Sequence, residues 1–246
     1  LGGNGGMGKD VAATGGNAGD GIFFRHIGDF KFKLTYAKII GGIGGSASVA
    51  GVNNTGLAGN GGHGINATFN EEASTQMSDL WFDFYDQSSI IVSGGEGGAN
   101  GNKETRVGGL GGSGIFNEQG GVWIQGLNSY NGNLEIYAGA NGKSYAKGNI
   151  GRYAASCNTI EINKMNVYFY GGKGSSSNIT GNCGSGGAPL LVNEERRYIT
   201  RNSYVYLYGG NGGTNDATGS GGTGYIWTGL EQSKFPNANF YDGNNG

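Results

Sequence analysis

The sequence predicts an all-β protein, a right-handed parallel β-helix (β-solenoid) of about six glycine-rich rungs with variable loops and uncapped ends. Three observations predict this fold class. Short runs of alternating apolar and polar residues, typical of strands, recur along the whole chain. Each run is followed by a glycine-rich segment, and glycine makes up 56 of the 246 residues. No segment shows a helical period with capping residues. Repeated units of strand and glycine segment are characteristic of solenoids.

The first element of each unit is an apolar pair in a strand-like run, as in residues 204–213 (YVYLYGGNGG). Two residues after the pair, a segment similar to G-G-x-G-G begins. Six such pairs recur at intervals of 33 to 53 residues: Ala37 and Ile39, Ile90 and Val92, Leu134 and Ile136, Val167 and Phe169, Val205 and Leu207, Ala238 and Phe240. Uneven spacing around a constant pattern predicts rungs that carry loops of different lengths.

Each unit contains two further strand-like runs. A second glycine cluster leads into a short apolar segment, as in residues 108–116 (GGLGGSGIF) and 219–227 (GSGGTGYIW). An alternating run then precedes the next apolar pair, as in residues 80–86 (LWFDFYD) and 121–126 (GVWIQG). Three short strands per unit are therefore predicted, and homologous strands of successive units can stack in register. Right-handed coiling is the default for parallel strands joined by crossovers.

The glycine clusters are expected to turn the chain off one wall of the coil, where a positive φ angle or a close backbone approach excludes a Cβ atom. A competing interpretation is a polyglycine bundle, in which G-G-x tracts form extended threefold helices packed side by side. The tracts are only about two triplets long. Because the alternating strands outweigh them, we expect such a bundle at most as a local feature of the outer loops.

Composition excludes several classes of protein. Two prolines are too few for collagen, and aromatic residues, at 11% of the chain, are more than a disordered chain carries. The net charge is −2 with both signs dispersed, so the sequence offers no basic patch for nucleic acid. No apolar run reaches the ~20 residues that span a bilayer. We therefore expect no nucleic-acid partner and no membrane insertion.

We expect residues 1–246 to form a single glycine-rich β-solenoid domain. Residues 1–6 (LGGNGG) and residues 241–246 lie in the same phase of the repeat, and neither end resembles the polar cap that closes a solenoid. Our interpretation is a segment of a longer repeat protein or a filament subunit. The two cysteines, Cys157 and Cys183, allow one disulfide or two thiols.

Motifs for nucleotide binding are incomplete. A G-x-G-x-x-G match at residues 3–8 lacks the following helix and the ribose-binding acid of a dinucleotide site. The G-K-S at residues 142–144 lacks the first glycine of a phosphate loop. The histidines, His26 and His63, do not lie in the context of a Ser or Cys nucleophile, and we expect them to be satisfied loop or surface residues.

The best carboxylate pair is Asp79 and Asp83 in residues 78–86 (SDLWFDFYD). If the intervening apolar residues face the core, Asp79, Trp81, Asp83 and Tyr85 share the outer face of one strand. We estimate the separation of the carboxylates at ~6.5 to 7 Å, near the range of glycosidase pairs. The alternative is a solvated face with aromatic packing, which we favour.

A tyrosine ladder is predicted on the wall formed by the apolar pairs. If those pairs point inward, the second outward position of the last four units is tyrosine: Tyr137, Tyr170, Tyr208 and Tyr241. Tyr168 and Tyr206 occupy the preceding outward position. Stacked rungs would place these side chains ~4.8 Å apart. Such a row predicts a sugar-stacking strip or a surface that meets another chain, unless glycine loops fold over it and make a second core.

The repeats VYLYGGNGG and GSGGTGYIW resemble those of right-handed β-helix surface proteins, the haemagglutinin-like and autotransporter-passenger adhesins, over most of the chain. The glycine clusters are also similar to those of phage tail-fibre adhesins with glycine-rich tips, which have longer G-G-x runs. Both resemblances imply a secreted or particle-surface protein whose repeats form a stiff rod. They also imply that loops or a side wall bind a partner.

We therefore expect an extracellular structural or adhesive protein on a cell surface or appendage, which forms or joins a fibre and is not an enzyme. Its expected partners are copies of itself, neighbouring repeats or surface glycans, with no cofactor and no metal. The expected contact residues are Tyr137, Tyr168, Tyr170, Tyr206, Tyr208, Tyr241, Trp81, Asp83 and Tyr85. Two alternatives stay open, a carbohydrate-active β-helix enzyme using Asp79 and Asp83, and a phage receptor-binding adhesin.

Overall fold

The computed structural model describes residues 1–8, 14–24, 30–47, 57–67, 79–100, 107–126, 132–145, 147–177, 183–193, 198–215, 221–226, 228, 232, 235 and 237–246. This part of the protein is all-β. Its strands are β1 (Ile22–Phe23), β2 (Phe30–Ile40), β3 (Ile65–Asn66), β4 (Leu80–Ser93), β5 (Ile115–Gly126), β6 (Asn133–Tyr137), β7 (Ala155–Asn163), β8 (Asn166–Tyr170), β9 (Leu190–Val192), β10 (Tyr198–Arg201), β11 (Tyr204–Tyr208) and β12 (Ala238–Tyr241).

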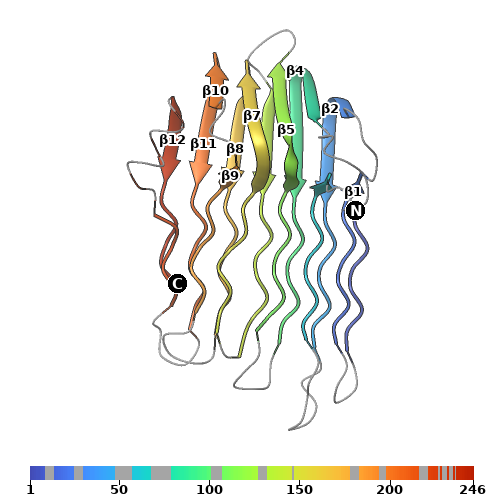
Figure 1. The fold of residues 1–246 in the computed structure, drawn as a ribbon, viewed down its shortest axis with the longest axis vertical. Coiled ribbons are helices and arrows are strands. Elements are labelled where there is room, and N and C mark those ends of the chain that lie inside the picture. The colour runs from blue at the N-terminus through green and yellow to red at the C-terminus, as the bar shows by residue number, and fades with distance from the viewer. Residues whose placement is uncertain are drawn as a thin grey trace.

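The strands pair in parallel, and successive units follow one another across the molecule, from blue to red in Figure 1. One row of the sheet joins the first apolar residue of every unit: Ala37, Ile90, Leu134, Val167, Val205 and Ala238. The alignment of the repeats therefore gives the same register as the structure. The paired strands form a half-barrel and a second parallel layer. The pairing is parallel because the chain returns to the same side of the molecule once per unit, so that equivalent strands run in the same direction.

The core lies between two walls of strands. On one wall, Leu80, Phe82 and Phe84 in the first half of β4 are buried to 1% exposure or less. On the other, Ile90 and Val92 in the second half of the same strand are equally buried. All five belong to one apolar cluster. The period-2 alternation puts the intervening residues outside, so the strand half of the protein is held by ordinary hydrophobic burial.

The glycine tracts run on from the strands as extended chains, drawn as wavy lines below the arrows in Figure 1. Their hydrogen bonds repeat every three residues. Gly94 and Gly97 donate to the carbonyls of Tyr137 and Ala140, in the neighbouring tract, at 2.9 and 3.0 Å. The residues that follow them, Gly95 and Gly98, donate instead to tract 57–64 at 2.8 and 2.9 Å. A three-residue period with bonds to different neighbours is that of a threefold polyglycine helix.

The tracts form two layers bonded to each other. The amides of Gly62, Gly95, Gly112 and Gly139 donate in turn to the carbonyls of Gly42, Gly62, Gly95 and Gly112, alternating between descending and ascending tracts. A Cβ atom on Gly95 would lie 1.8 Å from the carbonyl oxygen of Gly42. None of the glycines in the described tracts between Gly41 and Gly142 has a φ angle in the left-handed region. These positions therefore require glycine because the backbones approach closely, and not because of a positive φ angle.

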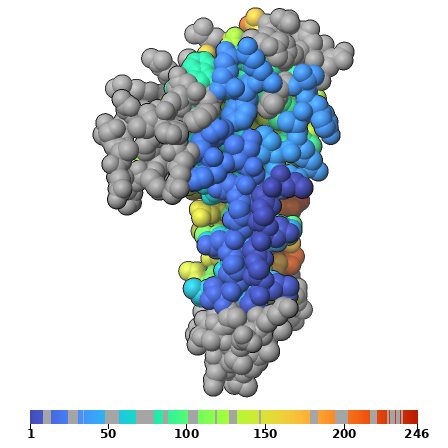
Figure 2. Space-filling view, turned by 90° about the vertical axis from the view of Figure 1, so that its right-hand side faces the viewer, coloured from blue at the N-terminus to red at the C-terminus, as the bar shows by residue number. Residues whose placement is uncertain are grey.

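The predicted right-handed β-helix of six rungs is wrong. In a β-helix the glycine segments would turn the chain within each coil, whereas here they leave the strands and build a separate bundle. The polyglycine bundle, which we expected only as a local feature of outer loops, makes up one half of the molecule. Figure 2 shows it as the slim stem below the broader strand half. A tract of only two triplets can hold the threefold conformation because each tract is hydrogen-bonded to neighbouring tracts on several sides.

Candidate functional site

The tyrosines of the last four units stack face to face. The ring centroids of Tyr137 and Tyr170 are 4.4 Å apart, those of Tyr170 and Tyr208 are 4.7 Å apart, and those of Tyr208 and Tyr241 are 4.5 Å apart. The rings are within 11° of parallel. A second row places Tyr168 and Tyr206 at 4.7 Å. We call these six residues the tyrosine ladder.

Parallel pairing in register produces the tyrosine ladder. Because β6, β8, β11 and β12 pair with homologous residues opposite each other, each tyrosine is placed beside its counterpart in the next unit. The side chains are half-buried, and Tyr241 at the end of the row is 44% exposed. The glycine tracts that follow these strands run into the bundle rather than over the rings.

The stacking limits what the tyrosine ladder can bind. Each ring face inside a row is covered by the next ring, so the ladder offers ring edges and hydroxyl groups to a partner. The Tyr137 hydroxyl donates to the Glu135 carboxylate. The pKa of Tyr170 is raised chiefly by partial burial and to a smaller extent by the neighbouring phenols and Glu135. Burial is also the main cause that raises the pKa of Tyr168 and Tyr208. Tyr168, Tyr170 and Tyr208 therefore keep their phenol protons at neutral pH.

The predicted carboxylate pair is not brought together. Asp79 accepts a hydrogen bond from the Gly121 amide at 2.8 Å. Asp83 is 4% exposed and pairs with the Lys31 ammonium at 2.7 Å. Our estimate of 6.5 to 7 Å applies to residues two positions apart, whereas these two are four apart, or ~13 Å along a strand. That separation exceeds the ~5 to 9.5 Å of glycosidase pairs. The side chain of Tyr85 lies outside the described part.

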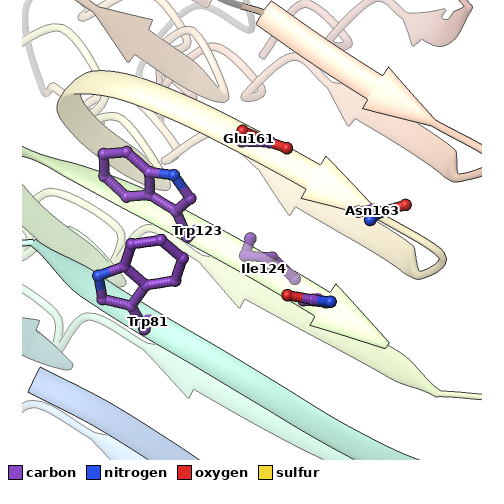
Figure 3. Close-up of a pocket in the computed structure, with 6 residues that line it drawn as sticks. Trp81, Trp123, Ile124, Glu161 and Asn163 are labelled. Carbon is purple, nitrogen blue, oxygen red and sulfur yellow. The ribbon is translucent and has the colours of Figure 1, made fainter. Parts of the chain in front are cut away.

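A pocket with an aromatic wall lies on the outer face of β4, β5 and β7 (Figure 3). Trp81 and Trp123 stack at 4.9 Å between centroids and 21° between planes. The cavity has a volume of about 160 Å³ and is lined by these residues with Ile124, Gln125, Glu161 and Asn163. Of this set, the sequence analysis identified Trp81 alone as a contact residue.

No protein-family model, curated protein or solved structure matches this chain. Among the described residues, no helix is long and apolar enough to cross a membrane, and no group of three or more His, Cys, Asp or Glu side chains is placed to hold a metal ion.

Two further titratable groups are of interest, the partly buried His63 and the fully buried Cys157. His63 stacks on Phe116 at 4.5 Å, and its Nδ1 accepts from the Ser113 amide at 2.9 Å. Burial lowers the pKa of His63, although Asp20 opposes this. Cys157 and Cys183 are both free thiols, and burial raises the pKa of Cys157 to about 12. The hydrogen bond and the ring contact indicate that His63 has a structural role in packing.

Proposed function

We propose that this chain is an extracellular, non-enzymatic adhesive module that presents ordered aromatic surfaces on a stiff glycine scaffold. The observation that carries the proposal is the tyrosine ladder, six half-exposed rings on one wall. Ordered aromatic surfaces of this kind are typical of protein contact sites, because tyrosine supplies contact area and a hydrogen bond at low cost in side-chain entropy.

The bundle supports this proposal by its stiffness. Interior tracts are hydrogen-bonded to neighbours in their own layer and in the opposite layer, as Gly94 and Gly95 illustrate with their bonds to Tyr137 and Gly62. Bending such a body would break several backbone bonds at once. A stiff arm that carries a flat contact wall suits a fibre or a surface appendage.

The exposed edges and hydroxyls of the tyrosine ladder favour a protein partner, and a second copy of the chain is the simplest one. Two flat ladders can meet edge to edge and exchange phenol hydrogen bonds. Sugar rings would need uncovered ring faces, which the ladder provides only at its ends.

The test is sedimentation velocity and electron microscopy of the purified protein over a hundredfold range of concentration. We expect concentration-dependent fibres or lateral assemblies. The double variant Tyr170→Thr/Tyr208→Thr should weaken assembly at least tenfold, because it removes the centre of the tyrosine ladder. Tyr36→Thr is the matched control, since Tyr36 is 79% exposed and lies outside the ladder. Monodisperse wild-type particles at every concentration, or equal effects of both variants, would overturn the ladder as a contact surface.

A receptor-binding adhesin of a phage tail fibre is the second candidate. The glycine bundle favours it, because the resemblance to glycine-rich fibre tips rests on G-G-x tracts, and such tracts build half of this molecule. Under this proposal, fluorescently labelled protein binds to bacterial cells and reduces phage adsorption to the strains that it binds. Absence of binding across a panel of strains would count against it.

A further inference from the structure

We propose that the pocket beside Trp123 binds one ring of a neutral saccharide. The pocket is formed by strands β4, β5 and β7, whereas the tyrosine ladder is on β6, β8, β11 and β12. The inference therefore goes beyond the proposed assembly of the ladder and does not depend on it.

The orientation of the Trp123 indole is set by a glycine. A Cβ atom on Gly121 would lie 1.6 Å from the ring of Trp123, so the indole rests against the backbone of Gly121. One face of the indole is covered by Trp81 on β4. On the other side, the register of β5 with β7 places Glu161 beside Trp123. Figure 3 shows the two indoles side by side at one end of the pocket, with Glu161 and Asn163 on the neighbouring strand.

Three polar side chains line the same pocket as Trp123. Glu161 pairs in register with Trp123, and Asn163 pairs with Gln125 in the next row. Within the described part of the chain, none of these three side chains is held by a hydrogen bond or an ion pair. Two amides supply both donors and acceptors, and a carboxylate supplies acceptors only. Polar groups without partners beside an uncovered aromatic face are available to a ligand.

The chemistry of the lining selects the ligand class. The electron-rich indole face attracts the C–H groups of a sugar ring, and the ring hydroxyls can both donate to and accept from the amides. Glu161 disfavours phosphates and acidic sugars by charge repulsion. A quaternary ammonium would leave both amides unused. The volume of about 160 Å³ is below the ~300 Å³ of pockets for drug-sized ligands, which suits a single ring.

The experiment follows the indole N–H signals of the full chain by ¹H–¹⁵N NMR. The chain has three tryptophans, and Trp123→Phe assigns the signal of the pocket. The probes are lactose, maltose and N,N′-diacetylchitobiose, with choline and adenosine monophosphate as representatives of other ligand classes. We expect at least one saccharide to shift the Trp123 signal saturably, with a dissociation constant of about 1 mM.

Two variants at the pocket rim separate a loss of saccharide binding from a loss of folding. Glu161→Ala and Asn163→Ala should each weaken saccharide binding at least fivefold while the remaining spectrum stays unchanged. Tyr36→Phe, on β2 and outside both the pocket and the tyrosine ladder, is the matched control and should bind as the wild type does. No shift with any saccharide would overturn the proposal. A shift with choline alone would identify a cation site instead, and a shift with adenosine monophosphate alone a nucleotide site.

Discussion

Asparagine at the third position of the glycine triplets has a specific structural role. In a threefold helix, one amide in three points away from the neighbouring backbones and needs another acceptor. Asn17 Oδ1 accepts from the amide of Asn60 at 2.8 Å, and Asn60 Oδ1 accepts from the amide of Leu110 at 2.9 Å. Asn211 does the same for Asn244 at 2.8 Å. The G-G-N triplet thus combines close packing at two positions with a side-chain acceptor at the third.

Adding a methyl group to an interior glycine should destabilise the protein strongly. A Cβ atom on Gly98 would lie 2.1 Å from the carbonyl oxygen of Gly45, whereas one on Gly3 would meet nothing within 4 Å. We expect Gly98→Ala to lower the free energy of unfolding by about 2 to 3 kcal/mol, the cost of overpacking. Gly3→Ala should cause no loss and can give a small gain from the unfolded chain. Chemical denaturation measures both, and equal effects would contradict the packing model.

At the scale of elements, register decides which side chains meet. The tyrosine ladder could be predicted because β6, β8, β11 and β12 are aligned by their repeats without interruption. The Trp123 pocket was harder to predict. The pairing of β5 with β7 is shifted between Asn117 and Gly121, and only beyond that irregularity does Trp123 lie beside Glu161. The runs LWFDFYD (80–86), GVWIQG (121–126) and NTIEIN (158–163) are equivalent elements of the repeat, and comparing their outward residues identifies Trp81, Trp123 and Glu161 as neighbours.

The buried thiol of β7 should make stability fall at alkaline pH. Burial raises the pKa of Cys157 from 9.0 to about 12, so the folded state binds its proton more tightly than the unfolded state. This contribution is complete below pH 9 and is lost as the pH rises from 9 to about 12. We expect Cys157→Ala to flatten the decline of urea midpoints over this range.

The matched control for this prediction is Cys183→Ala, at the other, partly exposed thiol. It should keep the wild-type slope. Tyr168, Tyr170 and Tyr208, whose pKa values are also raised, reduce stability in the same direction above pH 10 and leave a residual slope in every variant. Identical slopes for Cys157→Ala and the wild type would show that the thiol does not contribute.

The whole molecule consists of two halves held by different forces. The strand half buries apolar side chains such as Phe82 and Phe169, whereas the bundle buries glycine backbone through hydrogen bonds. The two halves are continuous, since tracts prolong strands, as residues 41–47 prolong β2 and residues 107–114 lead into β5 (Figure 1). We therefore expect them to unfold together, although their thermodynamic contributions differ.

The heat capacity change of unfolding should be unusually small for a chain of this length. Exposure of apolar surface raises the heat capacity, and exposure of polar backbone lowers it. Because the bundle exposes mainly backbone on unfolding, we expect a value clearly below the usual ~12 to 15 cal/mol/K per residue. Calorimetry at several pH values gives this quantity. A value within the usual range would mean that the bundle buries as much apolar surface as a normal core.

The amino-acid sequence by itself determined the all-β character, the strand periodicity, the register of the repeats and the positions of the tyrosine ladder. These depend on side-chain alternation, which is local and visible in the chain. Only the tertiary structure decided where the glycine tracts go. Glycine without a Cβ atom can form a turn or a threefold helix equally well. The choice is made by backbone hydrogen bonds to tracts distant in sequence, and these bonds leave no side-chain pattern beyond the G-G-x period.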